Sequence, residues 1–304
     1  MKLFTKKTTA EEVTEDLNLS GQIILVTGTT AGIGHETMRV LAMRGAHVLA
    51  TGRTVEKVIA ASDKMPGTIT PVALELTSLT SINRCTSSVL EAGLLPDTVI
   101  CNAGIYPFGD LELVRGIEKV FFANFLGHFA LINDLLPAML ERGTGKFVHV
   151  SSDSAYKQAP ACGIDFDNLC GEGKFDAGEA YGRSKLANAL FSLELAKRLK
   201  GTNLTSNAVH PGSIMTNISH SAPLWVKASL SLGRFFLRTV AEGAAAQVYV
   251  ASHPDADKES GCFFETCQPV DFEDTHPIRN RKLAQELWHV ATAMSQRLQA
   301  ETAV

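Results

Sequence analysis

Residues 23–34 read IILVTGTTAGIG. The first four are branched and apolar, a pattern typical of a strand buried on both faces of a parallel sheet. The glycines that follow, Gly28, Gly32 and Gly34, have GxxxGxG spacing. They let the backbone turn tightly and approach a pyrophosphate at a helix N-terminus. With a helix expected over His35–Arg44, the stretch predicts the strand, turn and helix of a dinucleotide-binding fold.

Short β-branched runs and longer helical stretches alternate through the rest of the chain. This alternation predicts one doubly wound parallel sheet of the Rossmann type, with helices on both faces and ligands at the carboxyl ends of the strands. The predicted strands are Ile23–Val26, Val48–Ala50, Val72–Leu76, Thr98–Cys101, Phe147–Val150 and Leu204–Val209.

No internal repeat or linker-like tract divides the chain, so a single catalytic domain is expected over residues 21–304. Residues 1–20 are polar and acidic, and we expect a flexible or surface-draped arm there. Two segments, Asp153–Glu179 and Ser213–Thr239, follow strands at the ligand-binding edge and are candidate substrate walls. The second predicts a substrate lid at about residues 213–240.

The bulk composition is that of a globular chain, with 45% apolar and 20% charged residues. The net charge of -4 offers no basic surface for nucleic acid. The six cysteines form no CxxC pair, and His35, His128 and His210 show no metal-ligand spacing, so we expect no metal.

The first twenty residues lack an apolar signal core, and no charge-free apolar run approaches about 18 residues. These patterns favour a cytoplasmic protein without a transmembrane segment. A homo-oligomer stays possible.

Arg53 stands about 20 residues beyond the glycines, at the end of the second predicted strand. In dinucleotide-binding folds the residue at this position contacts the adenine ribose, and an acidic residue would accept a hydrogen bond from the 2′-hydroxyl of NAD. This chain has a guanidinium instead, which can pair with the 2′-phosphate of NADP. The alternative interpretation is a solvated arginine at a strand end.

Tyr181 and Lys185 stand four residues apart on a predicted helix and therefore share one face. A phenol has a pKa near 10, and an ammonium group nearby favours its ionised form. The pair predicts a proton-transfer device, although a Tyr/Lys pair at this spacing is often structural.

The ordered motifs resemble the short-chain dehydrogenase/reductase family over about residues 20 to 265. They are TGxxxGIG, the NAG of residues 102–104, a helical Asn124, a serine after a strand, the YxxxK of residues 181–185, and the PG of residues 211–212. The resemblance implies an oxidoreductase that transfers hydride between a nicotinamide and a carbonyl or alcohol carbon.

It also implies catalytic roles. Ser152 would hydrogen-bond the substrate oxygen, Tyr181 would transfer the proton, and Lys185 would hold the nicotinamide ribose and lower the tyrosine pKa. Asn124 would anchor a water that links Lys185 to solvent; alternatively, it bonds only its own helix backbone. Ser151 and Ser154 are neighbours that could be mistaken for the catalytic serine.

The cofactor contacts that the resemblance implies follow the same motifs. Residues 102–104 would lie against the adenosine half, Pro211 and Gly212 under the nicotinamide, and Ile214 and Thr216 at its carboxamide. Glu75 stands where the family usually shows Asp near the adenine amine. The full expected set is Gly28, Thr30, Gly32, Ile33, Gly34, Arg53, Glu75, Leu76, Asn102, Ala103, Gly104, Tyr181, Lys185, Pro211, Gly212, Ile214 and Thr216.

Four further stretches are similar to the retinol-dehydrogenase-like branch. They are residues 46–48, 125–129, 181–188 and 239–244. The branch implies NADP(H) and a lipophilic aldehyde, ketone or alcohol, such as a steroid-like or retinoid-like compound.

The sequence therefore predicts an NADP(H)-dependent oxidoreductase. Two alternatives are compatible with the sequence: an NAD-dependent alcohol dehydrogenase, and a non-catalytic dinucleotide-binding scaffold. The complete set of Ser152, Tyr181 and Lys185 argues against the scaffold.

Overall fold

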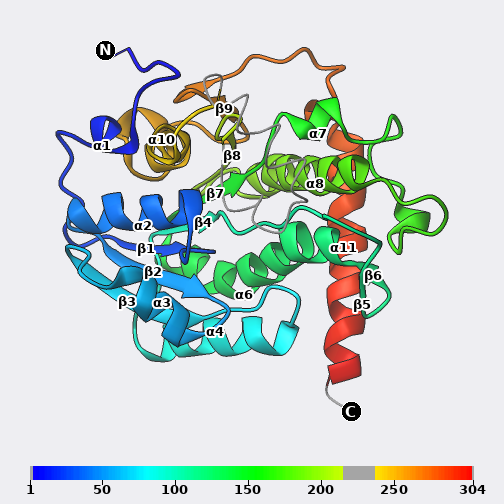
Figure 1. Cartoon of the computed structure of the whole chain (residues 1–304), viewed down its shortest axis with the longest axis horizontal. Helices are drawn as coiled ribbons and strands as arrows, with labels where there is room; N and C mark the ends of the chain where they lie inside the picture. The colour runs from blue at the N-terminus through cyan, green and yellow to red at the C-terminus, as the bar shows by residue number, and fades with distance from the viewer. Residues whose placement is uncertain (1–2, 215–236, 303–304) are drawn as a thin grey trace.

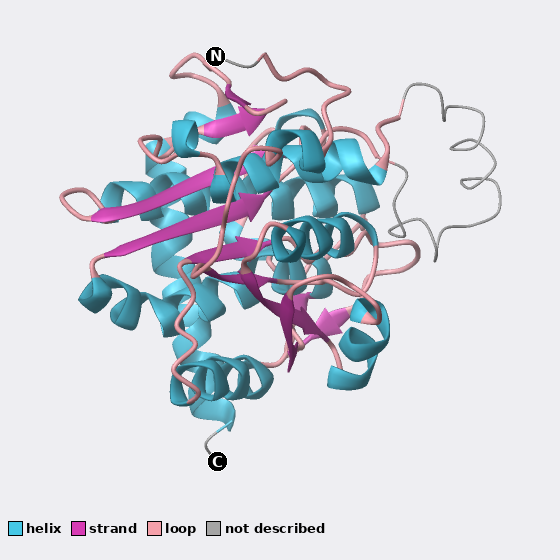
Figure 2. Cartoon of the chain, turned by 90° about the vertical axis from the view of Figure 1, so that its left-hand side faces the viewer, coloured by secondary structure: helices cyan, strands magenta, loops and turns pink. Residues whose placement is uncertain are grey.

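The computed structural model describes residues 3–214 and 237–302. Within these residues the main sheet has the strand order β3-β2-β1-β4-β7-β8-β9-β10 (Figures 1 and 2). Its strands are β1 (Ile23–Val26), β2 (His47–Gly52), β3 (Thr68–Ala73), β4 (Thr98–Cys101), β7 (Thr144–Val150), β8 (Asn203–His210), β9 (Phe263–Glu265) and β10 (Gln268–Pro269). A separate two-stranded ribbon joins β5 (Leu113–Val114) and β6 (Ile117–Glu118).

The strand order reverses between β1 and β4. From β1 the chain proceeds outward through β2 and β3, and it then returns to place β4 on the other side of β1. All neighbouring pairs from β3 to β9 are parallel, and β10 pairs with β9 in the antiparallel direction. This arrangement confirms the predicted doubly wound sheet and places the ligand-binding crevice at the carboxyl ends of β1 and β4.

Helices cover both faces of the sheet (Figure 1). One face carries α2, α3 and α10, and the other carries α4, α6, α8 and α11. The longer helices are α2 (Gly32–Met43), α3 (Val55–Ser62), α4 (Leu79–Glu91), α6 (Gly127–Arg142), α8 (Ala177–Arg198), α10 (Val240–Ser252) and α11 (Arg281–Thr302). The shorter ones are α1 (Ala10–Val13), α5 (Lys119–Phe121), the π-helix η1 (Phe122–Leu126), α7 (Ser154–Lys157), and the 3₁₀ turns η2 (Phe166–Asn168), η5 (Pro254–Ala256) and η6 (Pro277–Arg279).

The third strand differs from its prediction. It spans Thr68–Ala73 in place of Val72–Leu76. The chain turns after Ala73 because the Glu75 N–H donates to the Ser81 hydroxyl and the Thr77 N–H donates to the Glu75 carboxylate. Local side-chain bonds here replace sheet pairing, as they commonly do at strand ends.

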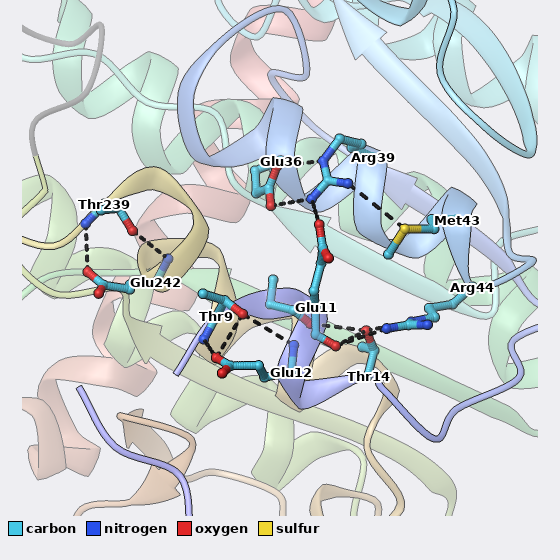
Figure 3. Close-up of polar contacts among 11 residues, drawn as sticks. Thr9, Glu11, Glu12, Thr14, Glu36, Arg39, Met43, Arg44, Thr239 and Glu242 are labelled. Atoms are coloured by element: carbon cyan, nitrogen blue, oxygen red, sulfur yellow. Dashed lines mark hydrogen bonds and ion pairs between the residues drawn. The ribbon is translucent and has the colours of Figure 1, made fainter. Parts of the chain in front are cut away.

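Residues 3–20, expected as a flexible or surface-draped arm, lie against α2 and α10 (Figure 3). Thr9 and Glu12 form a capping box that begins α1. Glu11 pairs with Arg39 of α2. Phe4 is 9% exposed and meets the ring of Tyr249 at 5.5 Å between centroids. Apolar burial and an ion pair thus dock the segment on the domain.

The stretch Lys119–Arg142, which runs through α5, η1 and α6, is long and apolar enough by composition to cross a membrane. In the structure 78% of its most apolar window is buried. It packs against α4, α8 and β7, which makes it a core element of this fold.

Candidate active site

The glycine turn lies at the carboxyl end of β1, and α2 begins inside it at Gly32. Gly28 has φ +73°, and a Cβ there would lie 2.9 Å from the Cα of Ala103. A Cβ on Gly34 would overlap the Gly28 carbonyl oxygen and the Asn102 side chain. Side chains at positions 28 and 34 would therefore occupy the space inside the turn, which the two glycines keep open. Its backbone and the N-terminus of α2 fit a pyrophosphate.

Side-chain hydrogen bonds connect the end of β4 to this turn. The Thr27 hydroxyl accepts the N–H groups of Asn102 and Ala103, each at 2.9 Å. The Asn102 amide donates to the Thr27 carbonyl at 2.8 Å and accepts from the Gln247 amide at 3.2 Å. The Asn102 side chain is thus used within the protein, where it sets the shape of the turn.

Arg53 follows the end of β2 and is exposed. Its guanidinium has no ion-pair or hydrogen-bond partner among the described residues. Gly52 beside it has no room for a side chain, because a Cβ would lie 2.8 Å from methyl carbons of Thr30 and Val58. The structure therefore offers one free cation at the strand end where the ribose is expected.

Glu75 and Leu76 lie just past β3. The Glu75 carboxylate accepts the Thr77 N–H at 3.0 Å and the Thr77 hydroxyl at 2.8 Å. Leu76 is buried, and its carbonyl approaches Gly127 so closely that any side chain at 127 would overlap it. Both residues help to build the chain turn here, and their expected contacts with the cofactor stay predictions.

Tyr181 and Lys185 lie in the first half of α8, which is capped by the Asp176 carboxylate. The Lys185 Nζ lies 5.5 Å from the centroid of the Tyr181 ring and donates to the Val150 carbonyl at 2.9 Å. Lys185 is 3% exposed, and burial lowers its pKa from 10.5 to about 8. The helix therefore brings the two side chains together, as their spacing predicts.

Asn124 lies in the π-helix η1, a kind of insertion frequent at functional sites. Its side chain leaves its own helix. The amide donates to the Ile105 carbonyl and to the Ser184 hydroxyl, both at 3.0 Å, and its oxygen accepts the Ile105 N–H. A Cβ on Gly104 would lie 3.3 Å from the Lys185 Nζ and 3.4 Å from the Asn124 Oδ1. Gly104 thus keeps space beside both polar groups.

Ser151 and Ser152 have different surroundings. Ser151 is 2% exposed, and its hydroxyl donates to the Lys185 carbonyl at 2.7 Å. Ser152 is half-buried, accepts the Ser154 N–H at 3.1 Å and lies 3.2 Å from the Asp153 carboxylate. Ser151 therefore has a structural bond. The Ser154 hydroxyl lies 3.2 Å from that of Ser152, and Ser152 stays the predicted candidate for binding a substrate oxygen.

Burial raises the pKa of the Tyr181 phenol well above its usual value, and the Asp153 carboxylate and Tyr106 add to the shift. Burial would also raise the pKa of Asp153, but the Lys157 ammonium at 2.7 Å and His210 hold it below its usual value. These surroundings favour the protonated form of the phenol. The lowering of its pKa by Lys185 stays a prediction.

The expected contacts of the segment after β8 with the nicotinamide stay predictions. Pro211 is buried, and Gly212 has φ +91°. The Arg238 side chain covers Gly212 and donates to the Pro211 carbonyl at 3.2 Å. Ile214 bridges to Arg238. Thr216 and most of the predicted lid, residues 215–236, lie outside the described residues.

Comparison with known proteins shows the family of this chain. A family model described as short chain dehydrogenase matches residues 22–164. The chain is 33% identical to retinol dehydrogenase 14 of Homo sapiens, over 91% of this chain and 87% of that protein. It is 35% identical to the chloroplastic short-chain dehydrogenase TIC 32 A of Brassica napus, over 92% and 90%.

The chain belongs to the short-chain dehydrogenase/reductase family. Its similarity to several retinol dehydrogenases places it in the retinol-dehydrogenase-like branch, which confirms the resemblance seen in the motifs. An uncharacterized protein of Mycobacterium paratuberculosis has the same fold, with a TM-score of 0.74 and 29% identity over 95% of this chain and 98% of that one. As a member of this oxidoreductase family, the protein interconverts carbonyl and alcohol groups with a nicotinamide dinucleotide.

Several residues of this short-chain dehydrogenase were missed in the sequence. Tyr106 contacts Tyr181 at 5.1 Å between ring centroids, Asp153 lies beside Ser152, and Arg238 covers Gly212. His128 contacts both Thr27 and Asn124. Asp153, adjacent to Ser152, and His128, four residues after Asn124, had a signal in the sequence. Tyr106 and Arg238 are brought to the site by long-range packing. Within the described residues, no group of three or more His, Cys, Asp or Glu side chains could hold a metal.

Proposed function

We propose that this enzyme is an NADP(H)-dependent reductase of lipophilic carbonyl compounds that works in the cytoplasm. The observation that carries the cofactor preference is Arg53, an exposed and unpaired guanidinium at the end of β2. An NAD-specific site would have a carboxylate there to accept from the ribose hydroxyl. A guanidinium instead favours the 2′-phosphate of NADP.

We infer the reductive direction from the NADP(H) preference, because cells generally keep that pool reduced, and a protonated phenol is the form that reduction uses. A Tyr181 that keeps its proton at neutral pH can donate it to a carbonyl oxygen as that oxygen gains charge. Ser152 would donate a hydrogen bond to the same oxygen, and Lys185 and Asn124 would hold the nicotinamide ribose and a water. NADPH would supply the hydride, and the glycine turn is shaped to hold its pyrophosphate.

The substrate class follows from the aromatic rings beside Tyr181. Tyr106 contacts Tyr181 at 5.1 Å and Phe108 at 4.8 Å between ring centroids. Such a wall would favour an extended apolar substrate such as a retinoid-like or steroid-like aldehyde or ketone. Retinol dehydrogenases among the relatives support this class. The proposed location rests on the cysteines, which are all free thiols, as is usual in a reducing compartment.

A panel of aliphatic, aromatic and polyene aldehydes and ketones with NADPH or NADH tests the proposal. We expect turnover with lipophilic carbonyls and a kcat/KM that favours NADPH. A preference for NADH with alcohol oxidation would instead indicate an NAD-dependent alcohol dehydrogenase. Dinucleotide binding without turnover on any member of the panel would indicate the non-catalytic scaffold.

A further inference from the structure

His128 occupies the first turn of α6, directly after η1, and is 1% exposed. Its Nε2 lies 2.9 Å from the hydroxyl oxygen of Thr27, at the end of β1. Its Nδ1 lies 3.0 Å from the carbonyl oxygen of Asn124. One imidazole therefore bridges the glycine turn, which would bind the cofactor, and the π-helix, which carries Asn124.

The hydrogen bonds of Thr27 determine the tautomer of this imidazole. The hydroxyl oxygen already accepts two N–H groups, from Asn102 and Ala103. Two lone pairs are thereby used, and the hydroxyl has one proton left to donate. The Ile100 carbonyl is 3.4 Å away, whereas the His128 Nε2 is at 2.9 Å. The Nε2 is therefore the unprotonated acceptor.

The other ring nitrogen gives the same answer independently. A carbonyl oxygen can only accept, so the Nδ1 that faces Asn124 must bear the proton. Burial and the nearby Lys185 ammonium lower the pKa of His128 to about 4, although the bond to Asn124 opposes the shift. A second proton would also place an N–H against the Thr27 oxygen, which already accepts two. His128 is thus neutral, with its proton on Nδ1.

The position of Asn124 depends on this contact. In η1 the Gly127 N–H bonds the Phe122 carbonyl, five residues earlier, so the backbone is wider here than in an α-helix. The His128 bond fixes the Asn124 backbone, while the Asn124 side chain reaches Ser184 on α8 at 3.0 Å. Lys185 follows on the same helix. Any displacement of Asn124 would alter the polar surroundings of the lysine.

We propose that His128 is a positioning residue with two separable bonds, one that shapes the cofactor turn through Thr27 and one that holds Asn124 beside Lys185. The role of the bond to Asn124 in catalysis rests on the proposed function. The role of the bond to Thr27 requires only that the protein bind a nicotinamide dinucleotide.

Two near-isosteric variants separate the bonds. In His128→Asn the amide nitrogen can occupy the place of Nδ1 and keep the bond to Asn124, but the group is too short to reach Thr27. In His128→Gln the longer side chain can place an oxygen where Nε2 stood and accept from Thr27, but it has no donor at the Nδ1 position. Each variant keeps one bond and loses the other.

Dinucleotide affinity is measured by nucleotide fluorescence, with whichever of NADPH and NADH the wild type binds. The kcat is measured with a carbonyl compound that the wild type reduces. For His128→Asn we expect the Kd to rise about three- to tenfold, the effect of one neutral hydrogen bond, with kcat within about twofold. For His128→Gln we expect kcat to fall about three- to tenfold, with Kd within about twofold.

His149 provides a matched control. It is also 1% exposed, and its Nε2 lies 3.1 Å from the Ser206 hydroxyl on β8, so this bond involves neither Thr27 nor Asn124. His149→Asn and His149→Gln should lower the Tm while leaving Kd and kcat of the folded protein within about twofold. If the His128 variants also lower the Tm and leave Kd and kcat unchanged, His128 only fills space in the core, and the proposal is wrong.

Nitrogen NMR of the wild-type imidazoles, assigned with the His128 variants, gives a test without turnover. The proposal requires a neutral ring protonated at Nδ1, and an Nε2–H tautomer would overturn it. Parallel changes of Kd and kcat in both variants would also overturn it. If the wild type binds dinucleotide but reduces no carbonyl, the proposed function fails, and the Kd and NMR results still decide the role of His128.

Discussion

The two sides of the catalytic edge of the sheet differ in how their polar groups are bonded. On the cofactor side, at the ends of β1 and β4, Thr27 and Asn102 each bond several backbone groups. On the substrate side, at the end of β7 and on α8, Ser152 lies against Asp153 and Ser154. The Tyr181 hydroxyl has no hydrogen-bond partner within the described part of the chain.

This difference indicates how the two sides are prepared for their ligands. The cofactor side is rigid because its turn is fixed by bonds that are made in the free protein. On the substrate side, the Ser152 and Tyr181 hydroxyls make long hydrogen bonds or none to the described residues of the protein. They are therefore available to donate to an oxygen that gains charge in a transition state. A change on the cofactor side should therefore affect dinucleotide binding or stability, whereas one on the substrate side should affect turnover.

Tyr181→Phe should produce the largest effect. The ring still packs against Tyr106, but the transferable proton is lost, so we expect kcat to fall about 10²- to 10⁴-fold with Kd for NADPH within about twofold. Steady-state kinetics and nucleotide fluorescence measure the two quantities. Tyr249→Phe, on α10, is the control and should retain activity. A Tyr181→Phe variant with near-normal kcat would contradict the mechanism.

Gly34→Ala tests the rigidity of the cofactor side. Its methyl group would overlap the Gly28 carbonyl and the Asn102 amide, neither of which can move freely. We expect a loss of stability at the upper end of the overpacking range, about 3 kcal/mol, and weaker binding of both dinucleotides. Urea unfolding and fluorescence titration measure these effects. Unchanged affinity would show that the turn can relax.

Arg53→Ala tests cofactor choice. Removal of one charge-assisted bond of about 1.5 to 3 kcal/mol should reduce kcat/KM for NADPH about ten- to a hundredfold and leave that for NADH nearly unchanged. Arg84→Ala, which removes an exposed cation from α4, is the control. A ratio of the two values that stays within about twofold of wild type would leave the NADP preference without support.

Lys185 should produce the smallest effect, a pH dependence of stability. Its pKa is lowered to about 8 in the folded protein, so the unfolded chain binds more protons above that pH and stability rises as the pH increases. For one such group the gain between pH 8 and 9 is about 1 kcal/mol. Lys185→Met should lose this gain when urea unfolding is compared at the two pH values. An unchanged pH dependence would mean that the lysine is hydrated.

The sequence predicted the features that depend on local patterns. Apolar runs located five of the six longer parallel strands, and the third begins four residues earlier than predicted. Glycine spacing located the turn, and the four-residue spacing placed Tyr181 and Lys185 on one face. In contrast, β9 is only three residues long and β10 only two, which is too short for periodicity to identify. The bridge from His128 to Thr27 joins residues 101 positions apart, so only the folded chain can form it.

The docked N-terminal segment has a consequence for the cooperativity of unfolding. Glu11 holds Arg39 on α2, and the same helix presents the glycine turn at its other end. Phe4 is inserted beside Tyr249 on α10, whose Gln247 bonds Asn102. Opening of the segment would expose apolar surface on both helices that support the turn. We therefore expect the segment and these helices to unfold as one cooperative unit, so that dinucleotide binding slows amide hydrogen exchange in α1 although no ligand touches it.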